Sequence, residues 1–570
     1  MKSLIILIIL TKFGFAFSQV TITQLPGYPK VIDSLDYTYN TAASSIVEDF
    51  NRDGRNEIFI SVNLSLSEGR VYLLNEDGRN MPGFPKKVSC FSSYIETASG
   101  DINGDGYLDM VILSDSLYVF NYLGNLLPGF PIKTYTPSNN LGGKLALYDL
   151  DNDKKLEIIT GRGDKMFVIN YNGTIRNGWP ITFRLSSIAG IDFPSIGDLN
   201  NDNIPEIIIP LEGFNSPLNY SDSGKIFVKE PNGTDYPGSP IISDSSYSFF
   251  FNPAAIYKQN GETYFAINSN RSTTGAPGSY KSRVSIYNSS LQLANRFFVN
   301  PPYQIDANSI GNFSSSATLD IVNGTSFTKV YAYNSITGLI NNFPVLYDNY
   351  QYRNSIMFKI NNVNYLSVYD TYQDSNRTKT RFFDKNGQES LSLPVFNYSV
   401  QSSSPLMCDL NKDGQMDFLI TTLDYPGYGD CTVLNAFTME GIPYVKNDIY
   451  WGMFGHDRYR TNQYGFTPPD EPVGIFVNNT NIPEKFLLFQ NYPNPFNPLT
   501  KINYELRVTN YVTLNVYDVN GRLVKELVNQ KQSAGNYSVD FEGSGLPSGT
   551  YIYRLQAGDF SETKKMVLLK

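Results

Sequence analysis

The chain has 570 residues, with 45 Lys+Arg against 54 Asp+Glu, a formal net charge of -9 and a single histidine, His456. At about 100–200 residues per domain, this length predicts several domains or one large array of repeats. The acidic balance argues against nucleic-acid binding, which needs a basic surface, and one histidine excludes metal sites that combine several histidines.

Residues 1–18 have the pattern of a secretory signal peptide. Lys2 precedes an apolar run from Leu4 to Leu10, and Ala16 and Ser18 are the small residues expected near a cleavage site. The run is too short to span a bilayer, and no later apolar stretch is long enough to do so. We therefore expect an exported chain without a transmembrane segment in its mature form.

A repeat occupies most of the chain after the signal peptide. Its units start near residues 49, 101, 149, 198, 257, 312, 359 and 409, with a mean step of about 51 residues. Five units begin with an acidic loop: DFNRDGRNE at Asp49, DINGDGYLD at Asp101, DLDNDKKLE at Asp149, DLNNDNIPE at Asp198 and DLNKDGQMD at Asp409. An apolar run typical of a β-strand follows each loop, and Asn/Gly turns, joined in the stronger copies by Gly-x-Pro, recur in the same phase.

A unit of about 50 residues with four short strands has the size of a propeller blade. We therefore predict an all-β fold with an eight-bladed β-propeller over residues 21–462; the alternative is seven blades and an irregular segment. The isolated PGYPK at Pro26–Lys30 precedes the first loop. It could supply an outer strand that closes the ring against the last blade.

The acidic loops carry the only strong chemical signal. Acids or Asn at positions 1, 3 and 5 direct oxygen ligands toward one point, position 6 needs a left-handed backbone and therefore favours Gly, and position 9 adds a carboxylate. This ligand set suits Ca²⁺, which accepts 6–8 oxygens, better than Mg²⁺. The alternative is a set of Asx-rich turns without an ion. Lys154 replaces the glycine in the Asp149 loop, and we expect the decayed loop at Asn312 to bind no metal.

The loops resemble the FG-GAP/VCBS repeats of integrin-α-like β-propellers over about residues 40–460. This resemblance implies about five structural Ca²⁺ ions. The ligands it implies are Asp49, Asn51, Asp53 and Glu57; Asp101, Asn103, Asp105 and Asp109; Asp149, Asp151, Asp153 and Glu157; Asp198, Asn200, Asp202 and Glu206; and Asp409, Asn411, Asp413 and Asp417. The segment Trp451–Thr461 resembles the end of bacterial propellers of this kind, which gives His456 a structural rather than a catalytic role.

A Pro- and Asn-rich linker over residues 463–485 precedes a different pattern. Residues 486–570 contain six short alternating runs separated by turn signals, which predicts a small Ig-like β-sandwich. The segments FLLFQNYPNPFNPLTKINYEL, VYDVNGRLVKEL and GLPSGTYIYRL closely resemble the type A sorting domain of type IX secretion cargo. The resemblance implies Sec export, recognition by the outer-membrane translocon, usually proteolytic removal by a sortase, and then release or surface attachment.

Three functions remain open from the sequence. We favour a non-catalytic, secreted or surface-attached propeller that binds a protein or glycan, for example in adhesion. The second is a polysaccharide lyase or hydrolase on a calcium-dependent propeller, and the third is a structural matrix component. The sequence contains none of the common catalytic motifs. Cys408 and Cys431 lie in one repeat and could pair, although we favour three buried thiols that include Cys90.

Overall fold

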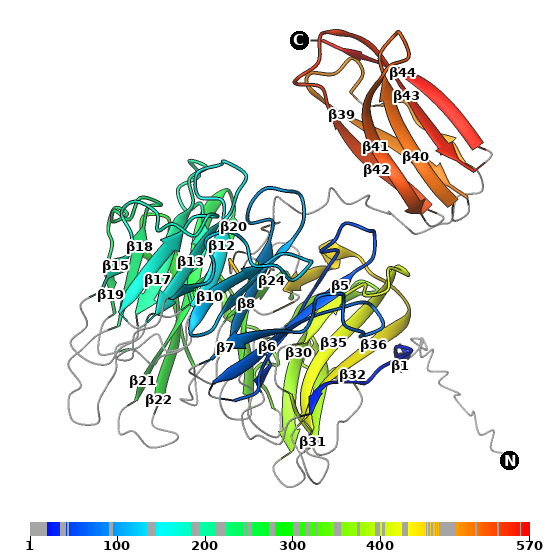
Figure 1. Cartoon of the computed structure of the whole chain (residues 1–570). Helices are drawn as coiled ribbons and strands as arrows, with labels where there is room; N and C mark the ends of the chain where they lie inside the picture. The colour runs from blue at the N-terminus through cyan, green and yellow to red at the C-terminus, as the bar shows by residue number, and fades with distance from the viewer. Residues whose placement is uncertain are drawn as a thin grey trace, which may run out of the picture. The chain divides into compact units, whose positions relative to one another are not determined.

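The apolar runs after the acidic loops form antiparallel strands, as their β-branched content favours. The computed structural model (Figure 1) divides the chain into two units, Met1–Pro468 and Pro469–Lys570, a boundary that falls inside the predicted linker. It describes residues 20–569 except 35–40, 43–44, 66, 91–94, 134–143, 163, 184–190, 192, 212–223, 244–246, 248–252, 273–279, 300–307, 315–317, 325–328, 347–354, 373–376, 394–398, 402–404, 425–430, 452, 454–456, 458–459, 462, 464–465, 467–485, 492, 508–509, 533–534 and 559. The predicted signal peptide, most of the linker and His456 lie outside the described residues.

Strands dominate the described residues, and their only helical element is a 3₁₀ turn, η1 (Lys446–Asp448). The predicted all-β class is therefore confirmed. A search of the described part of the chain for a helix able to cross a membrane finds none.

The described strands of the first unit form eight antiparallel sheets, numbered here 1 to 8 in chain order. Sheet 1 contains β3 (Thr41–Ala42), β4 (Ile46–Glu48), β5 (Glu57–Asn63), β6 (Glu68–Leu74) and β7 (Lys86–Ser89), and sheet 2 contains β8 (Glu96–Gly100), β9 (Asp109–Leu113), β10 (Ser116–Phe120) and β11 (Ile132–Lys133). Sheet 3 contains β12 (Lys144–Tyr148), β13 (Glu157–Arg162), β14 (Lys165–Ile169) and β15 (Ile181–Thr182), and sheet 4 contains β16 (Ser195–Gly197), β17 (Glu206–Leu211), β18 (Lys225–Lys229) and β19 (Ile241–Ile242). Sheet 5 contains β20 (Ala255–Gln259), β21 (Glu262–Ser272), β22 (Tyr280–Asn288) and β23 (Leu293–Val299), and sheet 6 contains β24 (Ser309–Gly311), β25 (Asp320–Gly324), β26 (Lys329–Asn334), β27 (Gly338–Leu339) and β28 (Val345–Leu346). Sheet 7 contains β29 (Met357–Ile360), β30 (Val363–Tyr372), β31 (Arg377–Asp384), β32 (Glu389–Ser392) and β37 (Ile449–Trp451), and sheet 8 contains β33 (Ser399–Gln401), β34 (Leu406–Cys408), β35 (Gln415–Asp424), β36 (Cys431–Pro443), β1 (Ile22–Gln24) and β2 (Lys30–Ser34).

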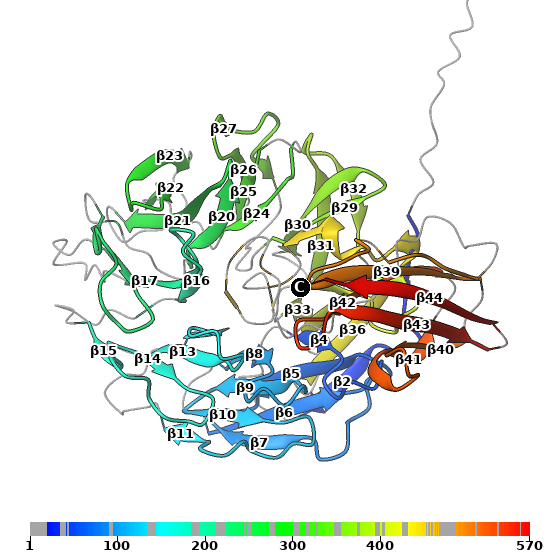
Figure 2. The ribbon, with the colours of Figure 1, turned by 90° about the horizontal axis from the view of Figure 1, so that it is seen from above.

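The eight sheets pack in a closed cycle around a common centre (Figure 2). Buried apolar clusters lie between each pair of consecutive sheets, and one of them joins sheet 8 to sheet 1 through residues such as Leu419 and Ile58. The first strands of sheets 2 to 7 contact one another in order, from β8 through β12, β16, β20 and β24 to β29. These strands therefore surround the centre, and the cores lie between the sheets.

The N-terminal strand closes the cycle, as the isolated PGYPK segment predicts. β2 pairs with β36 of sheet 8, with Lys30 opposite Leu434. Just before it, the Tyr28 hydroxyl donates a hydrogen bond of 2.9 Å to the carbonyl oxygen of Glu76, which belongs to sheet 1. The start of the chain thus completes the last sheet and also contacts the first one.

The end of the first unit runs among the central strands. β37 pairs with β29, the Arg460 Nε atom donates to the Thr97 carbonyl over 2.9 Å, and Ile196 N donates to the Thr461 carbonyl over 3.0 Å. Gln463 forms a parallel bridge with Ile256. The described residues among 449–463 therefore contact sheets 2, 4, 5 and 7, which lie on different sides of the centre.

The Gly-x-Pro segments make a second kind of contact between sheets. Gly129 has φ +92, and a Cβ atom at this residue would lie 2.1 Å from the Asn172 carbonyl oxygen in sheet 3. One sheet further on, Trp179 Nε1 donates a hydrogen bond of 3.0 Å to the Pro231 carbonyl. Each segment thus packs on the Asn/Gly turn of the following sheet.

The second unit consists of two antiparallel sheets that enclose one apolar cluster, which includes Tyr504, Phe541 and Tyr553. The strands are β38 (Leu487–Leu488), β39 (Leu499–Leu506) and β42 (Gly535–Glu542) in one sheet, and β41 (Leu523–Gln532), β40 (Asn510–Tyr517), β43 (Gly549–Ala557) and β44 (Phe560–Leu568) in the other. Asn491, buried at the start of the Asn-Tyr-Pro-Asn-Pro segment, donates to Thr500 Oγ1 over 2.9 Å.

Candidate metal-binding loops

All five predicted acidic loops join a first or second strand to the next strand of sheets 1, 2, 3, 4 and 8, and all share one backbone conformation. The sixth residue has positive φ in every loop, as predicted, and the fourth residue does as well. The residues with positive φ are Arg52, Gly54, Gly104, Gly106, Asn152, Lys154, Asn201, Asn203, Lys412 and Gly414. Lys154 therefore adopts at φ 68 the conformation that glycine takes in three of the other loops.

Backbone N–H groups hold the carboxylate at position 1. Gly54 N donates to Asp49 Oδ2 over 2.9 Å, and the sixth residue of every other loop makes the equivalent bond. The amide of the seventh residue donates in the same way to the acid at position 5. These are Asx-type turns, and they bring the side chains of positions 1, 3 and 5 together.

The acid at position 9 begins the next strand in sheets 1 to 4 and lies just inside β35 in sheet 8, and its side chain turns back toward the loop. One of its oxygens accepts the N–H of the second loop residue, as in the 2.7 Å bond from Leu199 N to Glu206 Oε2. The same bond recurs in all five loops. The other oxygen has no hydrogen-bond partner among the described residues in Glu206, whereas in Glu57 it accepts Asn51 Nδ2 over 3.1 Å.

Several buried carboxylate oxygens of these loops have no hydrogen-bond partner among the described residues. They include Asp49 Oδ1, Glu206 Oε1 and Asp409 Oδ1. Burial raises the pKa of Glu206 to about 8 and that of Asp409 to about 6, because a charged carboxylate loses its hydration. A cation in the loop would supply the missing partner, so the oxygen donors fit a hard metal ion.

The decayed loop at Asn312 differs at the same position. Asp320 accepts the Ser314 hydroxyl over 2.9 Å and Asn334 Nδ2 over 3.0 Å on one oxygen, and Ser314 N over 2.5 Å on the other. Protein donors therefore satisfy both oxygens. The units near 257 and 359 have tight turns instead of acidic loops, at Asn260-Gly261 and Asn361-Asn362.

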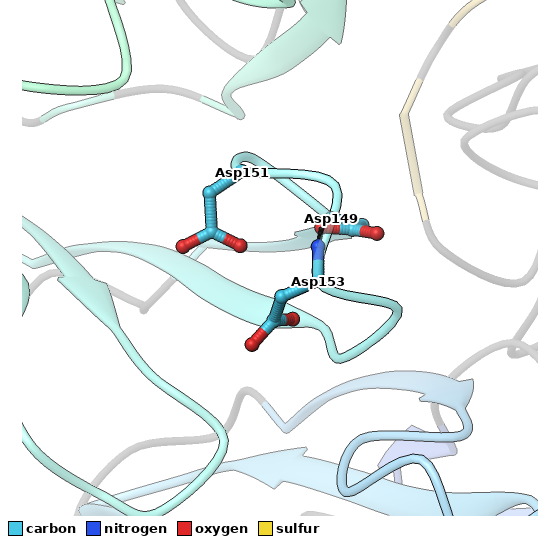
Figure 3. Close-up of side chains that lie close together, drawn as sticks. All are labelled: Asp149, Asp151 and Asp153. Atoms are coloured by element: carbon cyan, nitrogen blue, oxygen red, sulfur yellow. Dashed lines mark hydrogen bonds between the residues drawn. The ribbon is translucent and has the colours of Figure 1, made fainter.

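The Asp149 loop is the most acidic, and its first three acids lie close together (Figure 3). Oxygens of Asp149, Asp151 and Asp153 all lie within 4.8 Å of one another. In addition, Arg176 Nη1 lies 2.9 Å from Asp151 Oδ2 and 3.4 Å from Glu157 Oε1. Arg176 was not identified as a site residue from the sequence alone. It could have been found, because the equivalent position of other repeat units holds Met81, Leu127 or Tyr236, and an arginine stands out there.

Ring closure places the five loops on consecutive sheets, in the order 8, 1, 2, 3 and 4. Asn56 Nδ2 donates to the Asp409 carbonyl over 2.7 Å, and Lys412 Nζ lies 3.6 Å from Asp49 Oδ2. Arg52 Nε donates to the Gly106 carbonyl over 2.8 Å. The loops thus form one continuous arc, although residues 207–408, with three whole units, separate the Asp409 loop from the other four in the sequence.

The remaining predicted residues have simpler outcomes. His456 lies outside the described residues. Cys408 and Cys431 form no disulfide, and Cys90 and Cys408 are buried.

Family models match both parts of the chain. Residues 49–112 and 101–160 match the FG-GAP-like repeat, and residues 490–569 match the secretion system C-terminal sorting domain. The chain therefore carries FG-GAP-like repeats followed by a type IX sorting domain, as the resemblances imply. The sorting domain indicates export to the cell surface or secretion, and interaction with the type IX secretion machinery.

Solved structures give weaker similarities. The V. cholerae biofilm matrix protein Bap1 is 12% identical, with 78% of this chain and 96% of that chain covered and a TM-score of 0.39. PorZ, a surface component of the type IX secretion system of Porphyromonas gingivalis, is 9% identical, with 94% and 100% covered and a TM-score of 0.24. At these TM-scores the similarities support no conclusion about function. No curated protein sequence matches the chain.

Proposed function

We propose that this chain is an exported, non-catalytic binding protein built on an eight-bladed, calcium-stabilised β-propeller. The observation that carries the proposal is the closed cycle of eight sheets with an arc of acidic loops, followed in the chain by a type IX sorting domain. Each sheet would be one blade, and the two sheets of the second unit would form the Ig-like domain that the translocon recognises.

Calcium is the ion that the loops fit best. The donors at positions 1, 3, 5 and 9 are all oxygens, and Ca²⁺ tolerates the irregular geometry that backbone turns impose. Bound ions would compensate the buried carboxylates of Asp49, Glu206 and Asp409 and would link each loop to the strand that follows it. The ions are thus proposed as structural, and the ligand site as a separate surface.

A binding role is supported by the occupation of the centre. β37, Arg460, Thr461 and Gln463 contact central strands on several sides. Arg460 and Asp457 are buried there in bonds with Thr97 and Thr461. A lyase or hydrolase on this fold would instead need Arg, Lys, Tyr and acid side chains around an open funnel. We therefore propose that an extracellular protein or glycan binds to an outer face.

Chelation tests the calcium proposal. EDTA should lower the melting temperature by several degrees, because a ligand that binds only the folded state stabilises it by about 2.7 kcal/mol at 100 times its Kd. Excess Ca²⁺ should restore the melting temperature, and equimolar Mg²⁺ should not. An identical melting curve with and without EDTA would refute structural calcium.

Arrays of glycans and extracellular proteins test the binding role. Saturable binding to one ligand, with no release of unsaturated or reducing sugar ends, is the expected result. Sugar release would favour the enzyme. No binding to any ligand on the arrays would favour a structural matrix component.

A further inference from the structure

Arg176 occupies a repeat position that is apolar in the neighbouring sheets. Its backbone N–H donates to the carbonyl of Val168, and the same bond in sheets 1, 2 and 4 places Met81, Leu127 and Tyr236 at the equivalent position. The arginine lies in the one sheet whose acidic loop has Asp at position 3. The other loops have Asn51, Asn103, Asn200 and Asn411 there.

The guanidinium group of Arg176 binds two of the four loop positions that would hold a metal, positions 3 and 9. Nη1 lies 2.9 Å from Asp151 Oδ2 and 3.4 Å from Glu157 Oε1, and the side chains of Arg176 and Glu157 are 18% and 3% exposed. Glu157 Oε2 already accepts the N–H of Leu150 over 2.9 Å. Both oxygens of Glu157 therefore have protein partners.

The acids at the same position in two other sheets show why a protein partner on the second oxygen of Glu157 matters. In sheet 4, Glu206 Oε1 is buried, and no residue that the structure describes gives it a hydrogen bond. In sheet 6, where the loop has lost its acids, Ser314 and Asn334 bind the oxygen of Asp320 that would face an ion. Glu157 resembles Asp320 in this respect, with an arginine in place of the neutral donors.

We propose that Arg176 is the resident cation of the Asp149 loop and that it takes the place of calcium there. The proposal rests on the proposed calcium binding by the other loops and limits that binding to the loops at Asp49, Asp101, Asp198 and Asp409. A divalent ion among Asp149, Asp151 and Asp153 would share Asp151 with the guanidinium, and the repulsion between the two cations would weaken its binding. Sheet 3 consequently keeps its loop closed when calcium is scarce.

Calcium stoichiometry of the full chain tests this proposal. After EDTA treatment and dialysis, calorimetric titration should give four Ca²⁺ ions per chain for the unmodified protein. The double variant D149N/D153N should also bind four. Arg176→Met, which introduces the residue of the equivalent position in sheet 1, should bind five, and Arg176→Lys should keep four because it retains the positive charge.

Two controls keep the count interpretable. Arg79 is an exposed arginine in a turn of sheet 1, and it pairs with Asp77 rather than with an acidic loop. Arg79→Met should therefore leave the number of bound Ca²⁺ ions at four. Melting curves in calcium check that each variant folds. If Arg176→Met does not fold, Arg176→Gln gives the same test with an uncharged side chain that still forms hydrogen bonds.

The outcomes separate this inference from the proposed function. Five ions in the unmodified protein, falling to four in D149N/D153N, would overturn the role of Arg176 and leave structural calcium intact. A count of four that does not rise when the charge of Arg176 is removed would also overturn it. No calcium binding by any variant would overturn both.

Discussion

The two oxygens of the carboxylate at position 9 of each acidic loop have different surroundings. One oxygen accepts the N–H of the second loop residue, and this bond fixes the turn. The other oxygen contacts an arginine in Glu157 and has no donor among the described residues in Glu206, while in the decayed loop the corresponding oxygen of Asp320 accepts neutral donors. Because burial raises the pKa of Glu206 to about 8, its charged form is costly unless a cation is present.

Glu206→Gln should separate the roles of these two oxygens. The glutamine side-chain oxygen can still accept the N–H of Leu199. The substitution removes the buried negative charge that would bind Ca²⁺. We expect the variant to lose calcium-dependent stabilisation of about 2–3 kcal/mol at saturating calcium and to change little in EDTA. Thermal unfolding in both conditions measures the difference.

Asp320→Asn is the matched control, because its loop is expected to bind no metal. The substitution weakens the bonds from Ser314 and Asn334 and should cost about 1–3 kcal/mol, by the same amount with calcium and with EDTA. A Glu206→Gln effect that is equally independent of calcium would contradict a metal in the sheet 4 loop.

At the scale of elements, consecutive sheets meet twice, through apolar clusters inside and through the Gly-x-Pro segments further out. The cores depend on general apolarity, which tolerates substitution. The outer contact is stricter, because the Gly129 backbone lies directly against the Asn172 carbonyl. Steric fit at this contact therefore sets the spacing of sheets 2 and 3.

Gly129→Ala should destabilise the first unit more than a glycine substitution normally does. A positive φ costs an alanine about 1 kcal/mol, and the overlap of its Cβ with Asn172 should add about 1–3 kcal/mol. Gly261 has φ +82 with no atom within 4 Å of its built Cβ, so Gly261→Ala isolates the backbone cost. If denaturant unfolding gives the same loss of stability for Gly129→Ala and Gly261→Ala, the contact between Gly129 and Asn172 can move apart without strain.

At the scale of the whole first unit, the N-terminal strand joins the two ends of the repeat. β2 covers one edge of β36, and Leu25 and Tyr28 enter the cluster between sheets 8 and 1. This cluster also contains Leu410 of the Asp409 loop. Closure therefore stabilises the arc of loops as well as the ring.

Deletion of residues 19–34 should lower the melting temperature by several degrees and broaden the transition, because it exposes the β36 edge and opens the cluster between sheets 8 and 1. Val31→Thr on the same strand is the control, since Val31 is 61% exposed and should change stability by less than about 0.5 kcal/mol. An unchanged, equally sharp transition after the deletion would mean that sheets 8 and 1 hold together without the strand.

Local sequence was sufficient for much of this protein. Strand period, turn residues and the acidic nonapeptides depend on neighbours within a few positions, so the repeats, the left-handed sixth residue and the strands of the sorting domain could be predicted. The left-handed fourth residue could not, because Arg52 and Lys412 have no propensity for it and the turn imposes it.

Contacts between distant residues needed the tertiary structure. The pairing of β2 with β36, the approach of Lys412 to Asp49 and the ion pair of Arg176 with Asp151 join residues that no local pattern relates. The first two contacts result from the closure of the ring, which brings the first and last repeats together and turns five separate acidic loops into one arc. The ion pair lies within sheet 3, where the N–H of Arg176 donates to the Val168 carbonyl of β14 and β14 pairs with β13. The sequence alone therefore specifies where acidic oxygen donors gather, and the packing within the sheets decides that one of these loops, at Asp149, has an arginine beside it.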